Sequence, residues 1–178
     1  MNSRIHTGSS VTRIGFVLML VGFMVLALSQ APASAATVVS AKNVPTGTIL
    51  VRTSQRRLYY GLGNGKAIVY RVGVGRAGKQ WTGSTRIWRK ARNPAWAPTQ
   101  QIIRDNPNVP RLVPGGSPRN PLGAAALVLA KGNYAIHGTN KPGSIGGFVS
   151  YGCIRMHNRD IKDLYKRVSW GTRVVVTR

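Results

Sequence analysis

The feature that most constrains the fold is a series of short β-favouring segments separated by tight turns. Residues 48–53, 57–60 and 67–74 are rich in Val, Ile, Leu and Tyr, and Gly63-Asn64-Gly65 separates the last two. β-Branched and aromatic residues favour strands, and Asn-Gly is typical of a hairpin turn. The three segments therefore predict an antiparallel meander.

The second half of the chain continues this pattern and adds one helix. Residues 124–129 and 134–137 flank a Gly-Asn turn and predict a second hairpin, and residues 172–177 predict a buried closing strand. Between them, Asn158 is the expected N-cap of a helix. Its apolar face is formed by Ile161, Leu164, Tyr165 and Val168. The sequence predicts a mostly β domain with one helix just after Cys153.

Residues 75–121 have a different composition. They contain three tryptophans and seven of the ten prolines, with only brief strand-like pieces. A loop-rich segment of this length inside a small domain is typical of a lid or binding wall. The tryptophans could equally pack against the flank of the core, since aromatic residues serve both uses. Both interpretations stay open at this point.

The N-terminus has the pattern of an export signal. Arg4 and Arg13 are followed by an uncharged apolar run at 14–28, and Ala33-Ser34-Ala35 matches a signal-peptidase site. The run is shorter than the about 20 residues of a membrane span, although an uncleaved anchor is the alternative. We expect a signal peptide at 1–35, a short mobile linker at 36–47 and one domain at 48–178. The mature protein would be exported to the periplasm or cell wall without a stable membrane span.

Charge is the strongest deviation in composition. The formal net charge is +23, and Asp105, Asp160 and Asp163 are the only acidic residues. Such a field attracts anionic partners. Nucleic acid would be the first expectation for a basic chain, but the export signal argues against it. Carboxylate-bearing cell wall, acidic lipid or acidic polysaccharide are the expected partners, or the charge is simply solvated surface.

Cys153 is the only cysteine, so no disulfide can form within the chain. Exported cysteines usually pair, and an unpaired one indicates either intermolecular pairing or a reactive thiol. The three histidines and three aspartates lack the spacing of metal ligands, and we expect no metal or other cofactor.

A base for this thiol is available in the same region. A thiol needs a neighbouring base to become a good nucleophile, and histidine is the natural one. His137 ends a predicted strand, and a Gly-rich connection of fifteen residues leads to Cys153. The amides of Gly152 and Cys153 could form an oxyanion hole. The carbonyl of Gly138 could accept the Nδ1 proton of His137 and so orient the ring.

These residues also carry a family resemblance. The sequences His137-Gly-Thr-Asn140 and Ser150-Tyr-Gly-Cys-Ile-Arg-Met156 resemble the L,D-transpeptidase catalytic domain of bacterial cell-wall enzymes. The family usually has Ser-His-Gly-Cys, whereas this chain has Tyr151 at the second position. His137 is therefore the only histidine of the motif that can be the base. The resemblance implies a β-sandwich-like fold with one or two short helices and a loop-rich lid.

The resemblance also implies a reaction. Cys153 would attack the carbonyl between the L- and D-centres of a peptidoglycan tetrapeptide stem, release D-alanine and form a thioester. An amine on another stem, or on an envelope protein, would resolve the thioester, and water would make the enzyme a carboxypeptidase. Carbapenems would acylate the same thiol. The protein is expected to act as a monomer.

Four residues are expected to contact the substrate. Arg155 is a candidate carboxylate clamp because its guanidinium can bind bidentately, or it is a structural arginine of the loop. Ser150, Tyr151 and Asn140 complete the expected substrate-binding set.

Other classes fit the sequence less well. A sortase-like transpeptidase would place its histidine further upstream, and a wall-degrading cysteine endopeptidase usually has cysteine before histidine. A basic, non-enzymatic wall-binding protein would explain the charge but not the motif around Cys153. We therefore expect an enzyme.

Overall fold

The computed structural model describes residue 1 and residues 37–178, so nearly all of the predicted signal peptide lies outside the described residues. The described part is mostly β, as predicted, with two α-helices and a short 3-10 helix at Pro142–Ser144. The helices are α1 (Gln100–Asp105) and α2 (Asn158–Arg167). The strands are β1 (Thr37–Ser40), β2 (Ile49–Arg52), β3 (Arg57–Gly63), β4 (Lys66–Arg71), β5 (Val74–Gly75), β6 (Gly83–Arg92), β7 (Ala125–Leu129), β8 (Ala135–His137), β9 (Phe148–Ser150), β10 (Ile154–Arg155) and β11 (Arg173–Thr177).

Nine of these strands form one sheet in the order β1-β4-β3-β2-β11-β6-β7-β8-β10. Strand β6 belongs to both halves of it, because its first residues pair with β11 and its last residues pair with β7. A bulge at Trp88, where the register shifts, separates the two halves of β6. Bulges bend and twist a strand, so the sheet changes direction here. The core contains side chains from both halves of the sheet, which gives the sandwich-like arrangement.

The meander β2–β3–β4 is antiparallel, as its composition predicts. Ile49 and Val51 are fully buried and alternate with half-buried neighbours, the period-two pattern of a strand with one face in the core. The expected linker at 36–47 is in part a strand, because β1 pairs antiparallel with β4 along its whole length. The unpaired edge of β4 is a template for a further strand, and Val38 and Val39 favour one.

Helix α2 contacts β7 and β8 through an apolar face on which Ile161 and Leu164 are fully buried. Its N-cap is His157, whose side chain makes no capping bond, and not Asn158 as predicted. The side chain of Asn158 bonds instead to backbone groups of Ala124 and Thr139. These long-range partners outcompete the local capping bond that the sequence suggested.

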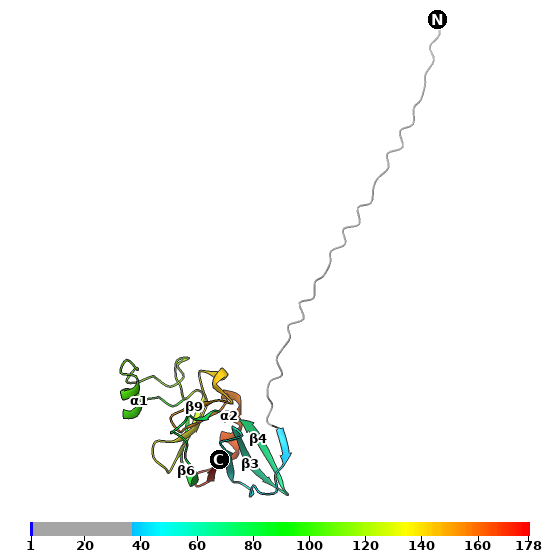
Figure 1. Ribbon diagram of the computed structural model, residues 1–178. Coiled ribbons are helices and arrows are strands. Elements are labelled where there is room, and N and C mark those ends of the chain that lie inside the picture. The colour runs from blue at the N-terminus through cyan, green and yellow to red at the C-terminus, as the bar shows by residue number, and fades with distance from the viewer. Residues whose placement is uncertain (2–36) are drawn as a thin grey trace. The chain divides into compact units, whose positions relative to one another are not determined.

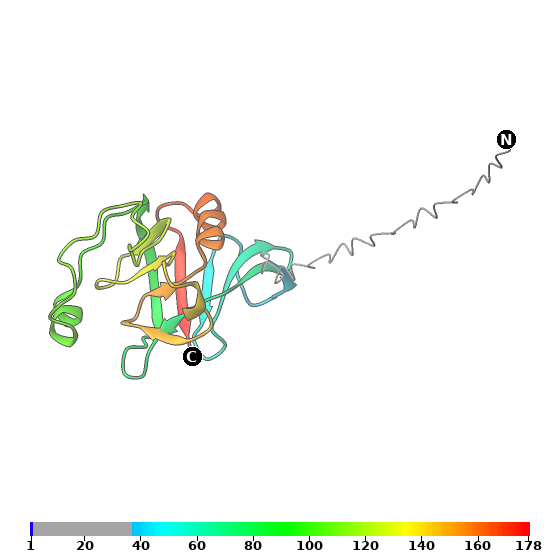
Figure 2. The same ribbon diagram turned by 90° about the horizontal axis from the view of Figure 1, so that it is seen from above.

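The loop-rich segment contains more regular structure than expected, since β6 has ten residues and α1 has six. In both views α1 lies at the far end of the green loops, away from β3 and β4 (Figures 1 and 2). Both interpretations of the tryptophans hold for different residues. Trp81 packs against the core, and Trp96 lines a cavity that also reaches Cys153.

Candidate active site

The parallel pair β8–β10 brings the two predicted catalytic segments together. His137 ends β8 and is in register with Arg155 of β10, while Ile136 is in register with Ile154. Cys153 comes directly before β10. The isoleucines are fully buried in the core, and they fix the register that places the histidine and cysteine segments side by side.

The imidazole of His137 is buried, with 4% of the residue exposed. Its Nδ1 lies 2.6 Å from the carbonyl oxygen of Gly138. With a proton on Nδ1 the carbonyl accepts a hydrogen bond, and Nε2 is left as a base. Burial lowers the pKa of His137 to about 4, although the Gly138 carbonyl opposes this shift. The charge of Arg155 lowers the pKa further, so the ring is neutral at neutral pH.

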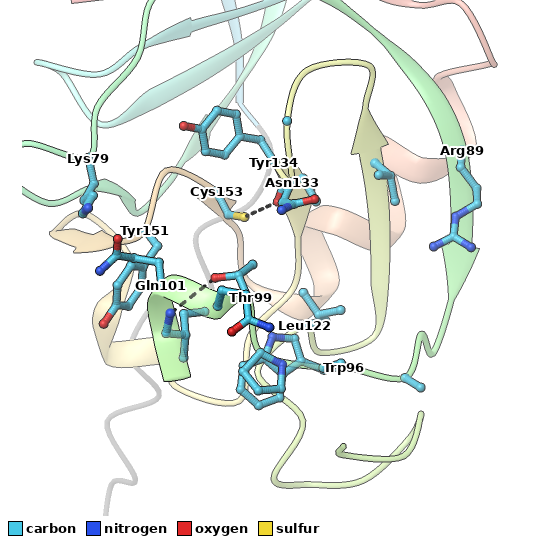
Figure 3. Close-up of a pocket in the computed structure, with 18 of the residues that line it drawn as sticks. Lys79, Arg89, Trp96, Thr99, Gln101, Leu122, Asn133, Tyr134, Tyr151 and Cys153 are labelled. Carbon is cyan, nitrogen blue, oxygen red and sulfur yellow. Dashed lines mark hydrogen bonds between the residues drawn. The ribbon is translucent and has the colours of Figure 1, made fainter. Parts of the chain in front are cut away.

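The thiol of Cys153 is protonated in the resting structure. Burial raises its pKa, and a backbone hydrogen bond at Ala135 and the charge of Arg155 only partly oppose this. Its sulfur lies 3.8 Å from the carbonyl oxygen of Asn133 (Figure 3). The resting state therefore has a protonated thiol and a neutral imidazole, and not a thiolate–imidazolium ion pair.

Ser150 shapes the loop before the cysteine. Its hydroxyl donates to the carbonyl of Cys153 at 2.6 Å and accepts from the amide of Gly152 at 3.0 Å. Ser150 is buried, so the structure gives it a role in holding the loop and no contact with the cavity. The Gly152 amide, predicted to face an oxyanion, is engaged by Ser150. Within residues 37–178 no bond is made by the amide of Cys153.

Gly152 is required by packing and by backbone conformation. Its φ is +118°, which side-chain-bearing residues rarely adopt. A Cβ here would collide with the ring of Tyr134. That ring stacks on Trp81 at 5.2 Å, and the indole of Trp81 donates to the Gly152 carbonyl at 2.9 Å. The space left by the missing side chain is therefore filled by Tyr134.

Asn158 is a positioning residue that the sequence did not identify as part of the site. Its Oδ1 accepts from the amides of Ala124 and Thr139 at 3.0 and 3.1 Å, and its Nδ2 donates to the Thr139 carbonyl at 3.0 Å. It thereby ties the first turn of α2 to the segment that follows His137. Its expected position as an N-cap was the only sequence signal, and it pointed to a different role.

A cavity of about 830 Å³ opens beside Cys153. Tyr151 lines it, as do Lys79 and Arg89, which lie on opposite sides of Cys153 in Figure 3. No Asp or Glu among the described residues lines it. Its outer wall comes from the loop-rich segment, chiefly Trp96, Thr99, Gln100, Gln101 and Ile102.

One ion pair connects this wall to the catalytic loop. Arg76 binds Asp105, the last residue of α1, at 2.6 Å, and its guanidinium lies 4.2 Å from the centre of the Tyr151 ring. Hydrogen bonds from Tyr151, Gln101 and Arg76 lower the pKa of Asp105. Tyr151, which stands where the resemblance leads one to expect histidine, thus holds α1 next to the thiol.

The other predicted substrate residues lie elsewhere. The side chain of Asn140 donates to the carbonyl of Arg119 at 2.9 Å, and Asn140 does not line the cavity. Arg155 does not line it either, and its Nε is buried without a partner among the described residues. Its charge acts on both Cys153 and His137. Arg155 is therefore placed to influence the protonation of the pair.

No three His, Cys, Asp or Glu side chains within residues 37–178 gather as a metal site would require. In the same part of the chain, neither helix is long and apolar enough to cross a membrane.

Comparison with known sequences gives a consistent result. A family model described as the L,D-transpeptidase catalytic domain matches residues 46–176. The "Probable L,D-transpeptidase YbiS" of Escherichia coli K12 is 40% identical over 139 residues, which is 74% of this chain and 44% of the relative. The "Probable L,D-transpeptidase ErfK/SrfK" of Salmonella typhimurium is 39% identical over 137 residues, 72% of this chain and 43% of the relative. The chain therefore spans less than half the length of these relatives.

Solved structures show the same fold. An L,D-transpeptidase from Mycobacterium smegmatis superposes with a TM-score of 0.59 at 16% identity, covering 74% of this chain and 58% of that one. The catalytic domain from an Enterococcus faecium L,D-transpeptidase, acylated by ertapenem, superposes with a TM-score of 0.56 at 19% identity. The match covers 73% of this chain and 95% of that one.

Proposed function

This chain belongs to the L,D-transpeptidase catalytic domain family, and from that premise we propose that it is a cysteine acyltransferase acting on peptidoglycan stem peptides. One observation carries the proposal. The thiol of Cys153 lies next to the strand that ends in His137, whose buried ring is neutral and oriented by a carbonyl. Nucleophilic catalysis by a thiol needs a neutral base on a neighbouring segment, and the pairing of β8 with β10 supplies one.

In the proposed first step the sulfur of Cys153 attacks the carbonyl carbon between the L- and D-centres of a tetrapeptide stem. Nε2 of His137 takes the thiol proton as the S–C bond forms. The C–N bond to D-alanine then breaks, and the leaving amine receives that proton from the imidazolium. The product is a thioester on Cys153. Because the resting pair is neutral, we place the proton transfer in the same step as the attack on the substrate carbonyl.

The negative charge that develops on the attacked carbonyl oxygen must be stabilised by hydrogen-bond donors. The amide of Cys153 is the first candidate, because it makes no bond within the described part of the chain. The amide of Gly152 becomes a second donor only if Ser150 releases it. Arg155 adds a positive charge next to the sulfur, which favours the thiolate as it forms.

The cavity suits an extended anionic substrate. Lys79 and Arg89 lie on either side of Cys153 and no carboxylate lines the space between them (Figure 3). A stem peptide carries carboxylates, and cations on both sides of the thiol favour their binding. The second step is attack on the thioester by an amine of another stem or of an envelope protein. Attack by water gives the shortened stem instead.

The proposed location is the cell-wall side of the inner membrane. It rests on the export-signal pattern of residues 1–35 and on the substrate that the family name implies. We propose that a monomer without metal or cofactor carries out both steps, since cysteine and histidine suffice for acyl transfer.

The test is to incubate the purified protein with a disaccharide-tetrapeptide and follow the products by mass spectrometry. We expect release of D-alanine, formation of a cross-linked dimer and a thioester on the wild-type protein, all absent from Cys153→Ala. Turnover by a folded Cys153→Ala variant would contradict the proposal. Release of D-alanine without dimer would show that water is the acceptor.

A further inference from the structure

A second concave site lies apart from the thiol, between the outer surface of α2 and the ends of β6 and β7. It has a volume of about 290 Å³ and is lined by Arg92, Lys162, Lys166 and Tyr165, with Ala124 and Ala125 among its small residues. We call it the basic cleft. None of its lining residues also lines the cavity beside Cys153.

The cations of the basic cleft have no carboxylate partner. The three acidic residues of the chain bind other arginines: Asp105 binds Arg76, Asp160 binds Arg159 and Asp163 binds Arg167. Asp163 lies on α2 itself, but Arg167 contacts both of its oxygens and the hydroxyl of Tyr70 binds one of them. The cations of the cleft therefore form no direct ion pair, and the charge of Asp163, which acts on Lys166, is shared with Arg167.

Like charges are also held together here. Lys90 and Arg92 both lie over the ring of Tyr165, at 4.4 and 5.3 Å from its centre. Lys162 and Lys166 are one turn apart on α2, a spacing at which like charges repel. Burial, and then the charge of Arg92, lower the pKa of Lys90. An anion bound in the cleft would offset the charges of Arg92, Lys162 and Lys166, which line it.

The placement of the cations on a strand and on two turns of a helix favours a phosphoryl group over a carboxylate. Arg92 approaches from a strand, and Lys162 and Lys166 approach from successive turns of a helix. A tetrahedral phosphate offers oxygens in several directions, whereas a carboxylate offers two in one plane. We propose that the basic cleft binds phosphoryl groups of a phosphate-bearing polymer and so holds the protein near it, independently of the chemistry at Cys153.

The test is calorimetric titration with short-chain inorganic polyphosphate at fixed ionic strength. Lys162→Gln/Lys166→Gln removes two cations of the cleft. Lys42→Gln/Lys66→Gln is the control, with the same change in charge at exposed lysines near the β1 edge of the sheet. We expect the first pair to weaken binding roughly tenfold, about 1.4 kcal/mol, and the control pair to weaken it less than twofold. The rate of Cys153 acylation by a carbapenem should be unchanged in both, which shows that the fold is intact.

Several results would overturn the inference. Equal weakening by the two pairs would mean that diffuse charge, and no site, binds the polymer. Equal binding of polyglutamate would exclude selection of phosphate, and no binding of polyphosphate by the wild type would exclude the site. Vesicles of phosphatidylcholine with phosphatidylglycerol distinguish a lipid source. If only these bind through Lys162 and Lys166, the ligand is a membrane headgroup and the polymer assignment fails. A protein that lacks acylation but still binds polyphosphate would refute the proposed function alone.

Discussion

The protonation of His137 couples catalysis to stability. Burial and the charge of Arg155 hold its pKa at about 4, whereas an unfolded chain has a histidine pKa of about 6.5. At pH values between about 4 and 6.5 the unfolded state binds more protons than the folded state. The free energy of unfolding therefore rises with pH over this range. Acidification from pH 6.5 to 4 therefore removes stability, by about 3 kcal/mol at most.

The prediction is checked by urea unfolding at pH 4 and pH 7 in the wild type and in His137→Gln, which cannot titrate. We expect the wild type to lose more stability than the variant on acidification. Equal losses would mean that the ring is not held neutral by burial. Activity that depends on the neutral ring should likewise fall as the pH drops through about 4.

Some site residues could be predicted because their residue type and spacing in the sequence already indicate a catalytic role. Cys153 is the single cysteine of the chain, and a histidine follows a β segment at a connectable distance. Asn158, Lys79 and Arg89 could not be found in this way. Their partners or cavity are separated from them in the sequence, and only the packing of β7, β8 and α2 brings them together.

At the scale of elements, α1 has little of its own to hold it in place. It has six residues, and none of them is buried. The C-terminal end of the helix is attached through Asp105, which forms an ion pair with Arg76 and contacts Tyr151. We expect Asp105→Asn to loosen this wall of the cavity. The KM for stem peptides should rise severalfold, and amides of residues 100–105 should exchange faster, with a small loss of global stability.

The control is Asp163→Asn, which removes the ion pair with Arg167 and weakens the bond from Tyr70 in a different part of the domain. It should lower global stability while exchange at 100–105 stays as in the wild type. Hydrogen-exchange mass spectrometry measures both variants. Unchanged exchange of α1 in Asp105→Asn would show that other contacts hold the wall.

Elements with a strong local pattern could be predicted and those built on distant pairing could not. The meander β2–β4, the hairpin β7–β8, α2 and β11 follow from alternation, turns and an apolar helix face. Strand β1 was missed because four residues of moderate propensity become a strand only beside β4. Strands β5 and β10 have two residues each, and long-range pairing alone defines them.

At the scale of the whole molecule, positive charge is spread over the surface and also lines the cavity beside Cys153. A chain with a formal charge of +23 and three acids, all in ion pairs, presents an uncompensated positive surface. The field attracts anionic polymers over distances of about 10 Å at 0.1 M salt. The proposed proton transfer in addition depends on the buried ring of His137, whose interactions salt screens weakly.

The central claim is that Cys153 is a nucleophile activated by His137, and acylation by a carbapenem tests it most directly. The E. faecium relative with the same fold is acylated by ertapenem. Intact-protein mass spectrometry after exposure to ertapenem should show one adduct on the wild type. The adduct should be absent from Cys153→Ala and should form much more slowly on His137→Gln. A folded, reduced wild-type protein that forms no adduct, or an adduct that persists in Cys153→Ala, would contradict the account.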